Sequence, residues 1–307
     1  MAEIARSLAD VAQAPSVVGI GFFDGVHRGH QSIIRRAVRF AEESGTRSVV
    51  VTFDRHPMEV VNPGSQPKLL MTLARRARVL GEQGVDLVVV LPFDDDLRHA
   101  SAEDFVDHVL CGPLQAQRVV VGANFRFGHK AAGDVAVLAD LGPSRGFASE
   151  GVTLLELDGT VISSTEIRAA VDRGDVERAT RMLGRPHVVD GVVVRGDQRG
   201  AELGYPTANL QVDPRIAVPA PGIYAGVAAL PGDRQAAAAI SVGTNPTFGG
   251  AELRIEAFLL DFDEDVYGVR CALDFRHRLR GQERYENIAD LAAQIGRDVV
   301  QTRALLR

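Results

Sequence analysis

The sequence predicts an α/β N-terminal domain with a Rossmann-like parallel sheet, followed by an antiparallel β-barrel domain with a terminal helix. Three observations lead to this prediction. The chain has 307 residues, which exceeds one average domain. In its first half, apolar runs alternate with helical patterns, as in parallel sheets wrapped by helices. In its second half, glycine and proline turns separate closely spaced strand-like runs, a pattern typical of small barrels.

The composition is that of a soluble globular protein. Hydrophobic residues make up 46% of the chain and charged residues 24%. A net charge of −6 argues against a broad surface for nucleic acid or an anionic membrane. No apolar stretch is long enough for a transmembrane helix, no signal-peptide core is present, and Cys111 and Cys271 lie far apart. We therefore expect a cytoplasmic protein, and the sequence carries no indication of its oligomeric state.

Apolar runs in the first half predict parallel strands, and polar motifs follow them. The runs span residues 17–20, 48–53, 85–93, 118–122 and 152–157. Ligands of such folds bind at the carboxyl ends of the strands. Four polar motifs fall there, at residues 21–30, 52–57, 122–128 and 163–168. We expect these motifs to form one site.

The first motif, GFFDGVHRGH (residues 21–30), predicts a strand-to-helix turn. Such a turn presents backbone N–H groups and the positive end of a helix dipole to an anion. His27 and His30 are spaced i, i+3, so both imidazoles share one helix face and can hold charge developing on a phosphate. The glycines fit neither a Walker P-loop nor a dinucleotide fingerprint, whereas the H-x-G-H spacing resembles the signature of nucleotidyl transferases. The alternatives are surface histidines without a role and a metal pair, with zinc the weaker option because no Cys or third His is near.

Two later motifs of this half also have a purely structural alternative. The motif at residues 122–128 contains one asparagine and two phenylalanines, and its alternative is an ordinary turn whose aromatic rings lie in the core. Ser163 and Glu166 have capping-box spacing, which predicts that a helix begins there and presents N–H groups, two hydroxyls and the Arg168 guanidinium to a second anion. The alternative is that the hydroxyls only cap the helix and Arg168 is a surface charge.

The sequence LGRP at residues 183–186 has helix-stop chemistry and predicts the domain boundary. We expect domains of residues 1–184 and 185–307. Beyond the boundary, strand-like runs that predict a closed antiparallel sheet span residues 188–195, 222–229, 237–242, 253–262 and 269–275. A final helix packed on the barrel is predicted from a cap at Asn287 or Asp290 and from an apolar stripe at Ile288, Leu291, Ile295, Val299 and Leu306.

The densest motif of the second half is GVVVRGDQRGAELGYPTANL. Gly196, Gly200 and Gly204 recur every four residues, which lets the backbone approach a ligand closely. Thr207 and Asn209 end the segment with side-chain oxygens, and oxygen ligands near phosphates suit Mg²⁺. The alternative is a glycine-rich hairpin without a ligand.

Glu256 is a candidate acid or base within the run at residues 253–262. Alternation places Ile255 and Ala257 on one face of the strand and Glu256 with Phe258 on the other, so Glu256 shares a side with large apolar groups. It is then either a carboxylate at a solvated barrel end or a functional acid/base whose surroundings tune its pKa.

Taken together, the motifs resemble the bacterial bifunctional riboflavin kinase/FAD synthetase family along nearly the whole chain. GFFDGVHRGH, TFDRHP, VGANFRFG and SSTEIR match its adenylyltransferase module. GDQRGAELGYPTANL, GIYAG, SVGTNPTF, IEAFLLDF and LRGQERY match its kinase module. The chain departs from the family pattern at Arg55, where Pro is frequent, at Tyr285, where Phe is common, and at Gln282 and Glu283, which reverse the usual Glu-Gln order.

The resemblance implies two phosphate transfers in sequence, with riboflavin, ATP, FMN and FAD as substrates and products. In the C-terminal module, the ribityl 5′-hydroxyl of riboflavin attacks the γ-phosphate of ATP, with Glu256 as general base and Mg²⁺ held by Thr207 and Asn209. In the N-terminal module, the FMN phosphate attacks the α-phosphate of a second ATP and pyrophosphate leaves. The resemblance further implies phosphate contacts at His27, His30, Asn124, Ser164 and Arg168, nucleotide pockets shaped by Gly21, Phe23, Asp24, Thr165, Gly196, Gly200 and Gly204, and flavin contacts at Phe125 and Phe127.

Two other functions stay open at this point. A nucleotidyltransferase with another acceptor, such as a pantetheine or nicotinamide nucleotide, fits the first half but leaves the barrel without a function. A non-catalytic flavin-binding or regulatory protein of the same fold conflicts with the presence of His27, Thr207, Asn209 and Glu256.

Overall fold

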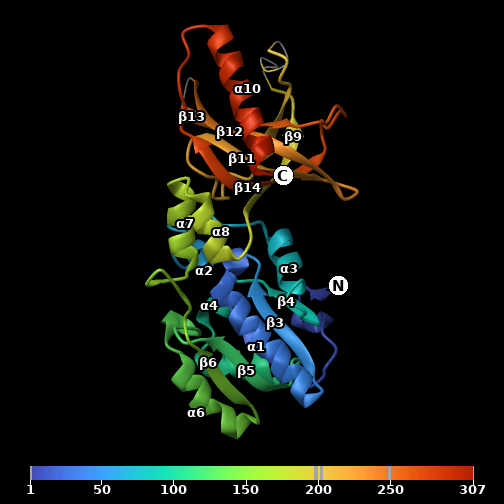
Figure 1. The fold of residues 1–307 in the computed structure, drawn as a ribbon. Coiled ribbons are helices and arrows are strands. Elements are labelled where there is room, and N and C mark those ends of the chain that lie inside the picture. Colours follow the sequence, from blue (N-terminus) through green and yellow to red (C-terminus); the bar gives the residue numbers. More distant parts are fainter. Residues whose placement is uncertain (1, 197–199, 201–202, 248–249, 307) are drawn as a thin grey trace. The chain divides into compact units, whose positions relative to one another are not determined.

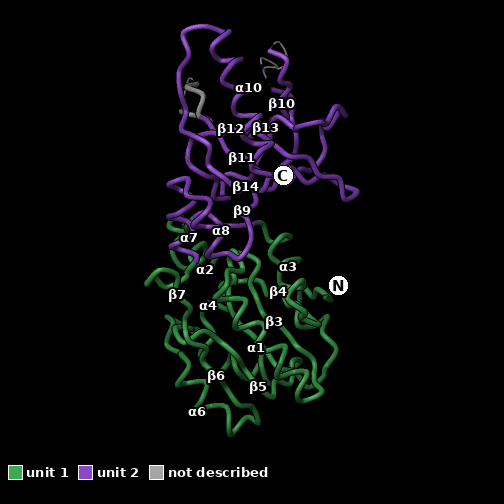
Figure 2. The backbone as a smooth tube through the Cα atoms, in the orientation of Figure 1, with its two compact units in different colours: residues 1–67, 72–163 green, residues 68–71, 164–307 purple. Residues whose placement is uncertain are grey.

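The computed structural model describes residues 2–196, 200, 203–247 and 250–306. The chain forms two compact units (Figures 1 and 2). The first comprises residues 1–67 and 72–163, and the second comprises residues 68–71 and 164–307. Each unit is built around a hydrophobic core of its own.

The first unit is built on a six-stranded sheet in which every pair of neighbouring strands is parallel. In spatial order the strands are β1 (Glu3–Ala5), β4 (Leu87–Leu91), β3 (Arg47–Phe53), β2 (Ser16–Ile20), β5 (Ala116–Gly122) and β6 (Ala148–Val152). β2 and β4 are buried along their whole length, because both faces of the sheet are covered. Burial on both faces explains why these strands appear in the sequence as continuous apolar runs. The predicted parallel sheet is confirmed.

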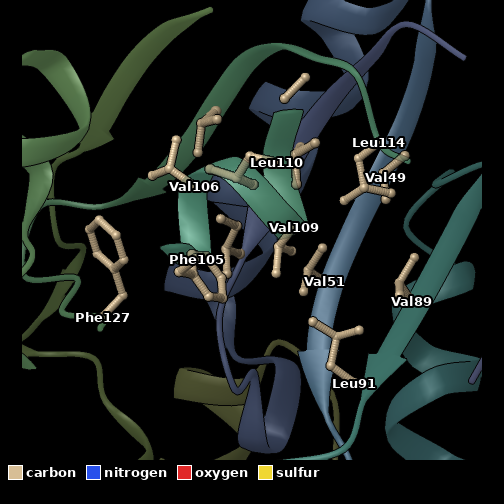
Figure 3. Close-up of a cluster of buried hydrophobic side chains, with 14 of the residues drawn as sticks. Val49, Val51, Val89, Leu91, Phe105, Val106, Val109, Leu110, Leu114 and Phe127 are labelled. Carbon is tan, nitrogen blue, oxygen red and sulfur yellow. The ribbon is translucent and has the colours of Figure 1, made fainter. Parts of the chain in front are cut away.

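Alternate strand residues enter two apolar clusters, one on each face of the sheet. Val17 packs with residues of α1 (Arg28–Ser44). Val18 belongs to the other cluster, together with residues of α5 (Ala102–Phe105) and the π-helix η3 (Val106–Cys111). Figure 3 shows this second cluster, in which side chains of β3 and β4 face those of α5 and η3.

The remaining helices of the first unit are short. They are η1 (Leu8–Asp10), η2 (Asp24–Val26), α2 (Pro57–Val61), α3 (Leu73–Gly81), α4 (Asp95–His99), η4 (His129–Ala131) and α6 (Val135–Arg145). α3 contacts both β4 and η2, the turn that follows β2. This contact places α3 directly beside the GFFDGVHRGH segment.

One predicted strand of the first unit is wrong in position. The run at residues 152–157 was expected to form the last strand, but residues 148–152 form it instead, as β6. β6 is an edge strand that pairs only with β5, and its residues are partly or fully exposed, so it has no continuous apolar run. The chain then forms a small hairpin of β7 (Glu156–Leu157) and β8 (Thr160–Val161). The edge strand β1 has no counterpart in the sequence prediction.

Among the described residues, the second unit contains a closed six-stranded barrel and the helices α7 (Ser164–Asp172), α8 (Val176–Leu183) and α10 (Ile288–Leu305), and the predicted antiparallel barrel is confirmed. Around the barrel the strands are β10 (Thr207–Val212), β13 (Gly250–Leu259), β12 (Arg234–Thr247), β11 (Gly222–Leu230), β14 (Arg270–Arg280) and β9 (His187–Val194). β10 completes the barrel from the glycine-rich segment, where no separate strand was predicted. Leu69 also belongs to this unit, since its N–H donates to the carbonyl of Arg215 at 2.7 Å.

Two helices precede the barrel, α7 (Ser164–Asp172) and α8 (Val176–Leu183). α8 packs on β9 and β14, and α7 packs on α8. Val176 is fully buried in the barrel core. Gly184 ends α8 with a φ of 76°, as the helix-stop chemistry predicted. The compact units thus divide before Ser164 rather than at residue 184, and the functional boundary at residues 184 and 185 stays a prediction.

The chain ends in α10 (Ile288–Leu305), which contacts β11, β12 and β14 (Figure 1). Of the two candidate caps, Asn287 fills the position, and its side chain accepts a hydrogen bond from the N–H of Asp290 at 2.9 Å. The helix packs on the barrel as predicted, but Ile288 is 71% exposed and does not belong to the packed stripe. The buried positions of α10 are instead Asp298 and Thr302.

Candidate active sites

The loop after β2 has a strained backbone. Phe23 and Val26 have φ angles of 55° and 39°, in the left-handed region, and Gly25 between them has a φ of 80°. Positive φ is costly for any side chain and most costly for a β-branched one such as valine. Phe23 and Val26 are nevertheless almost completely buried. The surrounding structure therefore holds this loop in a conformation that it would not adopt alone.

The two histidines of the loop lie against each other. His27 is the N-cap of α1, and its Nδ1 accepts a hydrogen bond from the N–H of His30 at 3.3 Å. The two rings stack with centroids 3.5 Å apart and an interplanar angle of 21°. The Phe23 ring meets His30 edge-on at 5.1 Å. The predicted proximity of the imidazoles at the start of a helix is confirmed, and their role at a phosphate stays a prediction.

Gly21 and Asp24 also belong to the predicted nucleotide pocket. A Cβ atom on Gly21 would lie 2.9 Å from the Phe23 ring, so this position has no room for a side chain. Asp24 is only 3% exposed, and Phe23 is buried as well. These residues can shape a nucleotide pocket through the backbone of the loop, but their side chains present little surface to a ligand.

The TFDRHP motif forms a rigid turn after β3. Both Arg55 Nε and Nη2 donate to Asp54 Oδ2, and Asp54 Oδ1 accepts from the N–H of Phe93 at 2.9 Å. Burial raises the pKa of Asp54, but these hydrogen bonds outweigh it and hold the pKa below its usual value. His56 caps α2 by accepting from the N–H of Met58. Arg55, the departure from the family pattern, thus serves as the ion-pair partner of Asp54.

The turn after β5 combines an exposed residue with a core residue. Asn124 is exposed. Phe127 is 7% exposed and belongs to the core cluster in Figure 3. Phe125 is partly buried and its ring stacks on that of Phe127 at 5.6 Å. The structural alternative for this motif therefore describes Phe127, while Asn124 and Phe125 keep surface that a ligand can contact.

Residues 164–168 of the SSTEIR motif belong to the second unit, whereas Ser163 is the last residue of the first. A helix begins at Ser164, as predicted. Arg168 Nη2 donates to Thr165 Oγ1 at 3.4 Å, so the guanidinium lies beside the first turn of α7. That the side chains of Ser164 and Arg168 form one site with the histidine pair stays a prediction.

Glu256 lies in the middle of β13 and faces two other strands. It is the Cα partner of Asn209 on β10 and of Ser241 on β12. Directly paired residues share a face of the sheet, so Asn209 and Glu256 extend to the same side. The neighbouring residues Ile255 and Ala257 point into the barrel core, as alternation predicted. Glu256 is partly buried at this position, and the choice between a solvated carboxylate and a functional acid or base stays open.

A cavity of about 240 Å³ lies between this face of the barrel and α10. Its polar lining residues on the strands include Thr207, Ser241 and Glu256. The Tyr205 ring meets the Phe258 ring edge-on at 5.4 Å, and α10 contributes Ile295. Such a cavity, largely apolar and aromatic with a few polar groups, is typical of sites for small flat ligands.

Sequence reasoning assigned no role to three residues that line this cavity, Arg280, Gln282 and Asp298. Gln282 Nε2 donates to the carbonyl of Val242 at 2.9 Å. Arg280 Nη2 binds Asp298 Oδ2 of α10 at 2.7 Å, and Asp298 is only 4% exposed. A carboxylate on the inner side of a helix was the signal that could have found this pair, since a buried charge requires a partner.

The two remaining departures from the family pattern meet in the same loop. Tyr285 donates through its hydroxyl to Glu283 Oε2 at 2.7 Å. Glu283 also lies 3.7 Å from Arg280 Nη1. Glu283 therefore contributes to the shape of the loop that lines the cavity.

Two glycines of the second-half motif, Gly196 and Gly200, have no room for side chains. A Cβ atom on Gly196 would collide with the Asn209 amide, and one on Gly200 would collide with the carbonyl of Tyr205. Gly204 has a φ of 80°, which favours glycine. These close approaches are to atoms of this chain, and the predicted approach to a ligand stays a prediction. Residues 197–199 and 201–202 of the motif lie outside the described residues.

Comparisons with known proteins agree with both halves of the molecule. The family model of FAD synthetase matches residues 10–166, and that of riboflavin kinase matches residues 183–306. The bifunctional riboflavin kinase/FMN adenylyltransferase of Pseudomonas fluorescens is 40% identical over 290 residues, which cover 94% of this chain and 92% of that protein. The protein of the same description from Escherichia coli K12 is 32% identical, covering 98% of this chain and 97% of the relative.

A solved structure agrees with the fold as a whole. The crystal structure described as a macrolide-efflux protein from Streptococcus pneumoniae has a TM-score of 0.89 and 30% identity to this chain, and covers 98% of both chains. Among the residues described here, no helix combines the length and apolar character needed to cross a membrane. On the family models and the two relatives above, the chain belongs to the family of bifunctional riboflavin kinase/FMN adenylyltransferases.

Proposed function

We propose that the second unit phosphorylates riboflavin with Glu256 as the general base. The first unit then adenylylates the resulting FMN, with the His27–His30 pair at the reacting phosphate. Family membership carries the pair of reactions, since both family models match and the relatives are named for both activities. The single observation that carries the site assignment is the position of Glu256, which faces Asn209 and lines the cavity beneath α10. A transferase with another acceptor would leave this cavity without a substrate.

Phosphorylation of riboflavin needs a base and close positioning. The ribityl 5′-hydroxyl attacks the γ-phosphate of ATP in line with the leaving ADP, and Glu256 accepts the hydroxyl proton. The aromatic and aliphatic walls of the cavity, Tyr205, Phe258 and Ile295 among them, suit the flat ring system of a flavin. No protein nucleophile takes part, so most of the acceleration comes from positioning and from stabilisation of charge.

Thr207 and Asn209 fit a magnesium ion. The two residues are spaced i, i+2 on β10, so their hydroxyl and amide oxygens leave the strand on the same side. Mg²⁺ prefers such hard oxygen ligands and takes only one or two of them from the protein when phosphates and water complete its shell. Gly196 supports this assignment, because its missing side chain leaves space for the Asn209 amide. When bound, the ion would neutralise charge on the phosphates of ATP.

Adenylyl transfer uses a different set of residues. The FMN phosphate attacks the α-phosphate of a second ATP, and pyrophosphate leaves. His27 and His30, at the N-terminus of α1, are placed to stabilise the charge that develops on the reacting phosphate. Asn124, Ser164 and Arg168 supply further donors to the ATP phosphates, with Thr165 beside them.

The remaining predicted contacts keep narrower roles. Gly21, Phe23 and Asp24 shape the adenylyltransferase nucleotide pocket, and Gly196, Gly200 and Gly204 shape that of the kinase. Phe125 contacts the flavin of FMN, and Phe127 supports Phe125 from the core. A reducing cytoplasm suits both cysteines, Cys111 and Cys271, which are free thiols.

Product analysis tests this function. The full chain is incubated with riboflavin, ATP and Mg²⁺, and the flavins are separated over time. We expect FMN to form first and FAD to follow, with no product when either ATP or Mg²⁺ is omitted. Conversion of a pantetheine or nicotinamide nucleotide in place of FMN would favour the other nucleotidyltransferases, and absence of any product would favour a non-catalytic flavin-binding protein.

A further inference from the structure

Arg76 of α3 is a buried charge to which the two reactions described above give no role. Its side chain is only 3% exposed. Nη1 donates to the carbonyl oxygen of Phe22 at 3.1 Å, and Nη2 donates to that of Phe53. The guanidinium also lies over the Phe22 ring, 4.2 Å from its centroid. A single side chain of α3 therefore joins the loop after β2 to the end of β3.

Burying this cation costs free energy. Burial lowers the pKa of Arg76 to about 10, and the charges of Asp24 and Asp54 partly offset that effect. Packing of α3 alone does not require the charge, since a large apolar side chain would fill the same volume without the desolvation penalty. The rigid guanidinium fork, which offers several donors in one plane, is what an apolar side chain cannot supply.

The carbonyl group of Phe22 is the point at which Arg76 controls the loop. Its oxygen also accepts a hydrogen bond from Thr52 Oγ1 at 2.9 Å, so two donors fix the orientation of the peptide plane. The next residue, Phe23, is the first of the loop with a positive φ, 55°. The Phe23 ring in turn meets His30, and His30 stacks on His27. A continuous set of contacts thus leads from Arg76 to both imidazoles.

We infer that Arg76 is a positioning residue for adenylyl transfer, which holds the strained loop so that His27 and His30 face the reacting phosphate. The inference rests on the proposed assignment of the histidine pair to that reaction. Without the guanidinium, the Phe22 carbonyl loses one of its two donors and the loop can relax toward ordinary φ angles. The imidazoles would then move away from the position that the transition state requires.

The test compares Arg76→Met and Arg76→Lys in the full chain with Arg78→Met, an exposed position on the same helix. We expect Arg76→Met to lower kcat for FAD synthesis about 10²-fold, the typical effect of a displacement of about 1 Å, with little change in the KM values for ATP and FMN. FMN formation from riboflavin should be unchanged in the same samples. Arg78→Met should leave both activities at the parent level. A parent-like kcat for Arg76→Met would overturn the inference.

Arg76→Lys keeps the test decisive if Arg76→Met does not fold. Lysine keeps the positive charge but offers one nitrogen in place of the guanidinium fork, which donates to the carbonyls of Phe22 and Phe53. Arg76→Lys should therefore lower kcat for FAD synthesis and leave FMN formation unchanged. A parent-like kcat for FAD synthesis in Arg76→Lys would contradict a role of the fork.

His27→Asn distinguishes the assignment of the histidine pair from the inference about Arg76. If His27→Asn leaves FAD synthesis intact, the assignment of the histidine pair is wrong. If His27→Asn abolishes FAD synthesis while Arg76→Met does not reduce kcat, the assignment stands and only the inference about Arg76 is wrong.

Discussion

Asn209 and Glu256 are paired residues of neighbouring antiparallel strands, and their side chains leave the barrel wall on the same face. Thr207 follows the same side of β10, and both Thr207 and Glu256 line the cavity beneath α10. A proposed metal ligand, a proposed base and a cavity for the acceptor thus lie within one small area of the second unit. This arrangement is the basis of the kinase mechanism, and it leads to separate tests for each residue.

Asn209→Ala should weaken the dependence of FMN formation on magnesium. Loss of one oxygen ligand should raise the half-saturating Mg²⁺ concentration at least about 10-fold at fixed ATP, a change comparable to the usual cost of disturbing a metal site. Gly196→Ala should act in the same direction, because its Cβ would displace the Asn209 amide. Gln211→Ala, at an exposed position further along β10, is the matched control. An unchanged magnesium titration for Asn209→Ala would remove Asn209 from the metal site.

Fragments should separate the two activities. Residues 186–307 and residues 164–307 should both make FMN and neither should make FAD. The longer fragment should unfold at a higher temperature, because it keeps Val176 in the barrel core, and burial of such a side chain contributes about 1.5–3 kcal/mol. It also keeps the carbonyl of Arg173, to which Arg278 donates at 3.0 Å. Thermal unfolding and flavin analysis check both statements. Failure of both fragments to make FMN would show that the kinase module is not independent.

His27→Asn should abolish FAD synthesis and leave FMN formation intact. Asparagine is a favourable N-cap residue, so this variant keeps a side-chain acceptor at the start of α1 while it removes the imidazole. The rate of FAD formation should fall by about 10² or more, as expected for loss of a preorganised group that stabilises charge. His108→Ala, at an exposed histidine of the same unit, should have no effect. Equal loss of both activities in His27→Asn would point to unfolding instead of a local role.

Asp298→Asn should destabilise the second unit through the ion pair at the cavity. Asp298 is 4% exposed and is the closest carboxylate partner of Arg280, so its removal leaves a largely buried cation with only the more exposed Glu283 as counter-charge. The expected cost is about 3 kcal/mol, and the KM for riboflavin should rise because both residues line the cavity. Asp261→Asn breaks the exposed pair with Arg303 and should cost less than about 1 kcal/mol. Denaturant unfolding of both variants is the measurement, and equal costs would contradict this account.

The sequence predicted those features that have a regular period or a continuous apolar run. β2 and β4 are buried throughout, so their valine-rich runs are visible in the sequence. β6 is not, because an edge strand with exposed residues carries no such run. Alternation alone predicted that Glu256 lies on the opposite face of its strand from Ile255 and Ala257, and these two neighbours are core residues. Arg76 could not, because an arginine within a helix is expected at the surface, and only the tertiary structure shows the carbonyl groups that receive its hydrogen bonds.

The histidine pair shows a second limit of sequence reasoning. The i, i+3 spacing predicted that His27 and His30 share a helix face, and their rings do stack. The spacing carried no information on Phe23 and Val26, whose positive φ angles depend on contacts with residues far along the chain. Strain of this kind appears where tertiary contacts hold a loop, and local sequence rules do not report it.

Glu256→Gln tests the central claim most directly, because the claim assigns the base of one reaction to one residue and leaves the other reaction untouched. Glutamine keeps the size of the side chain but cannot accept the ribityl proton. FMN formation from riboflavin should fall about 10²- to 10⁴-fold, the usual contribution of a general base. The same preparation, supplied with FMN, ATP and Mg²⁺, should make FAD at close to the parent rate. Near-normal phosphorylation of riboflavin by this variant would contradict the mechanism and return Glu256 to a structural carboxylate of the barrel wall.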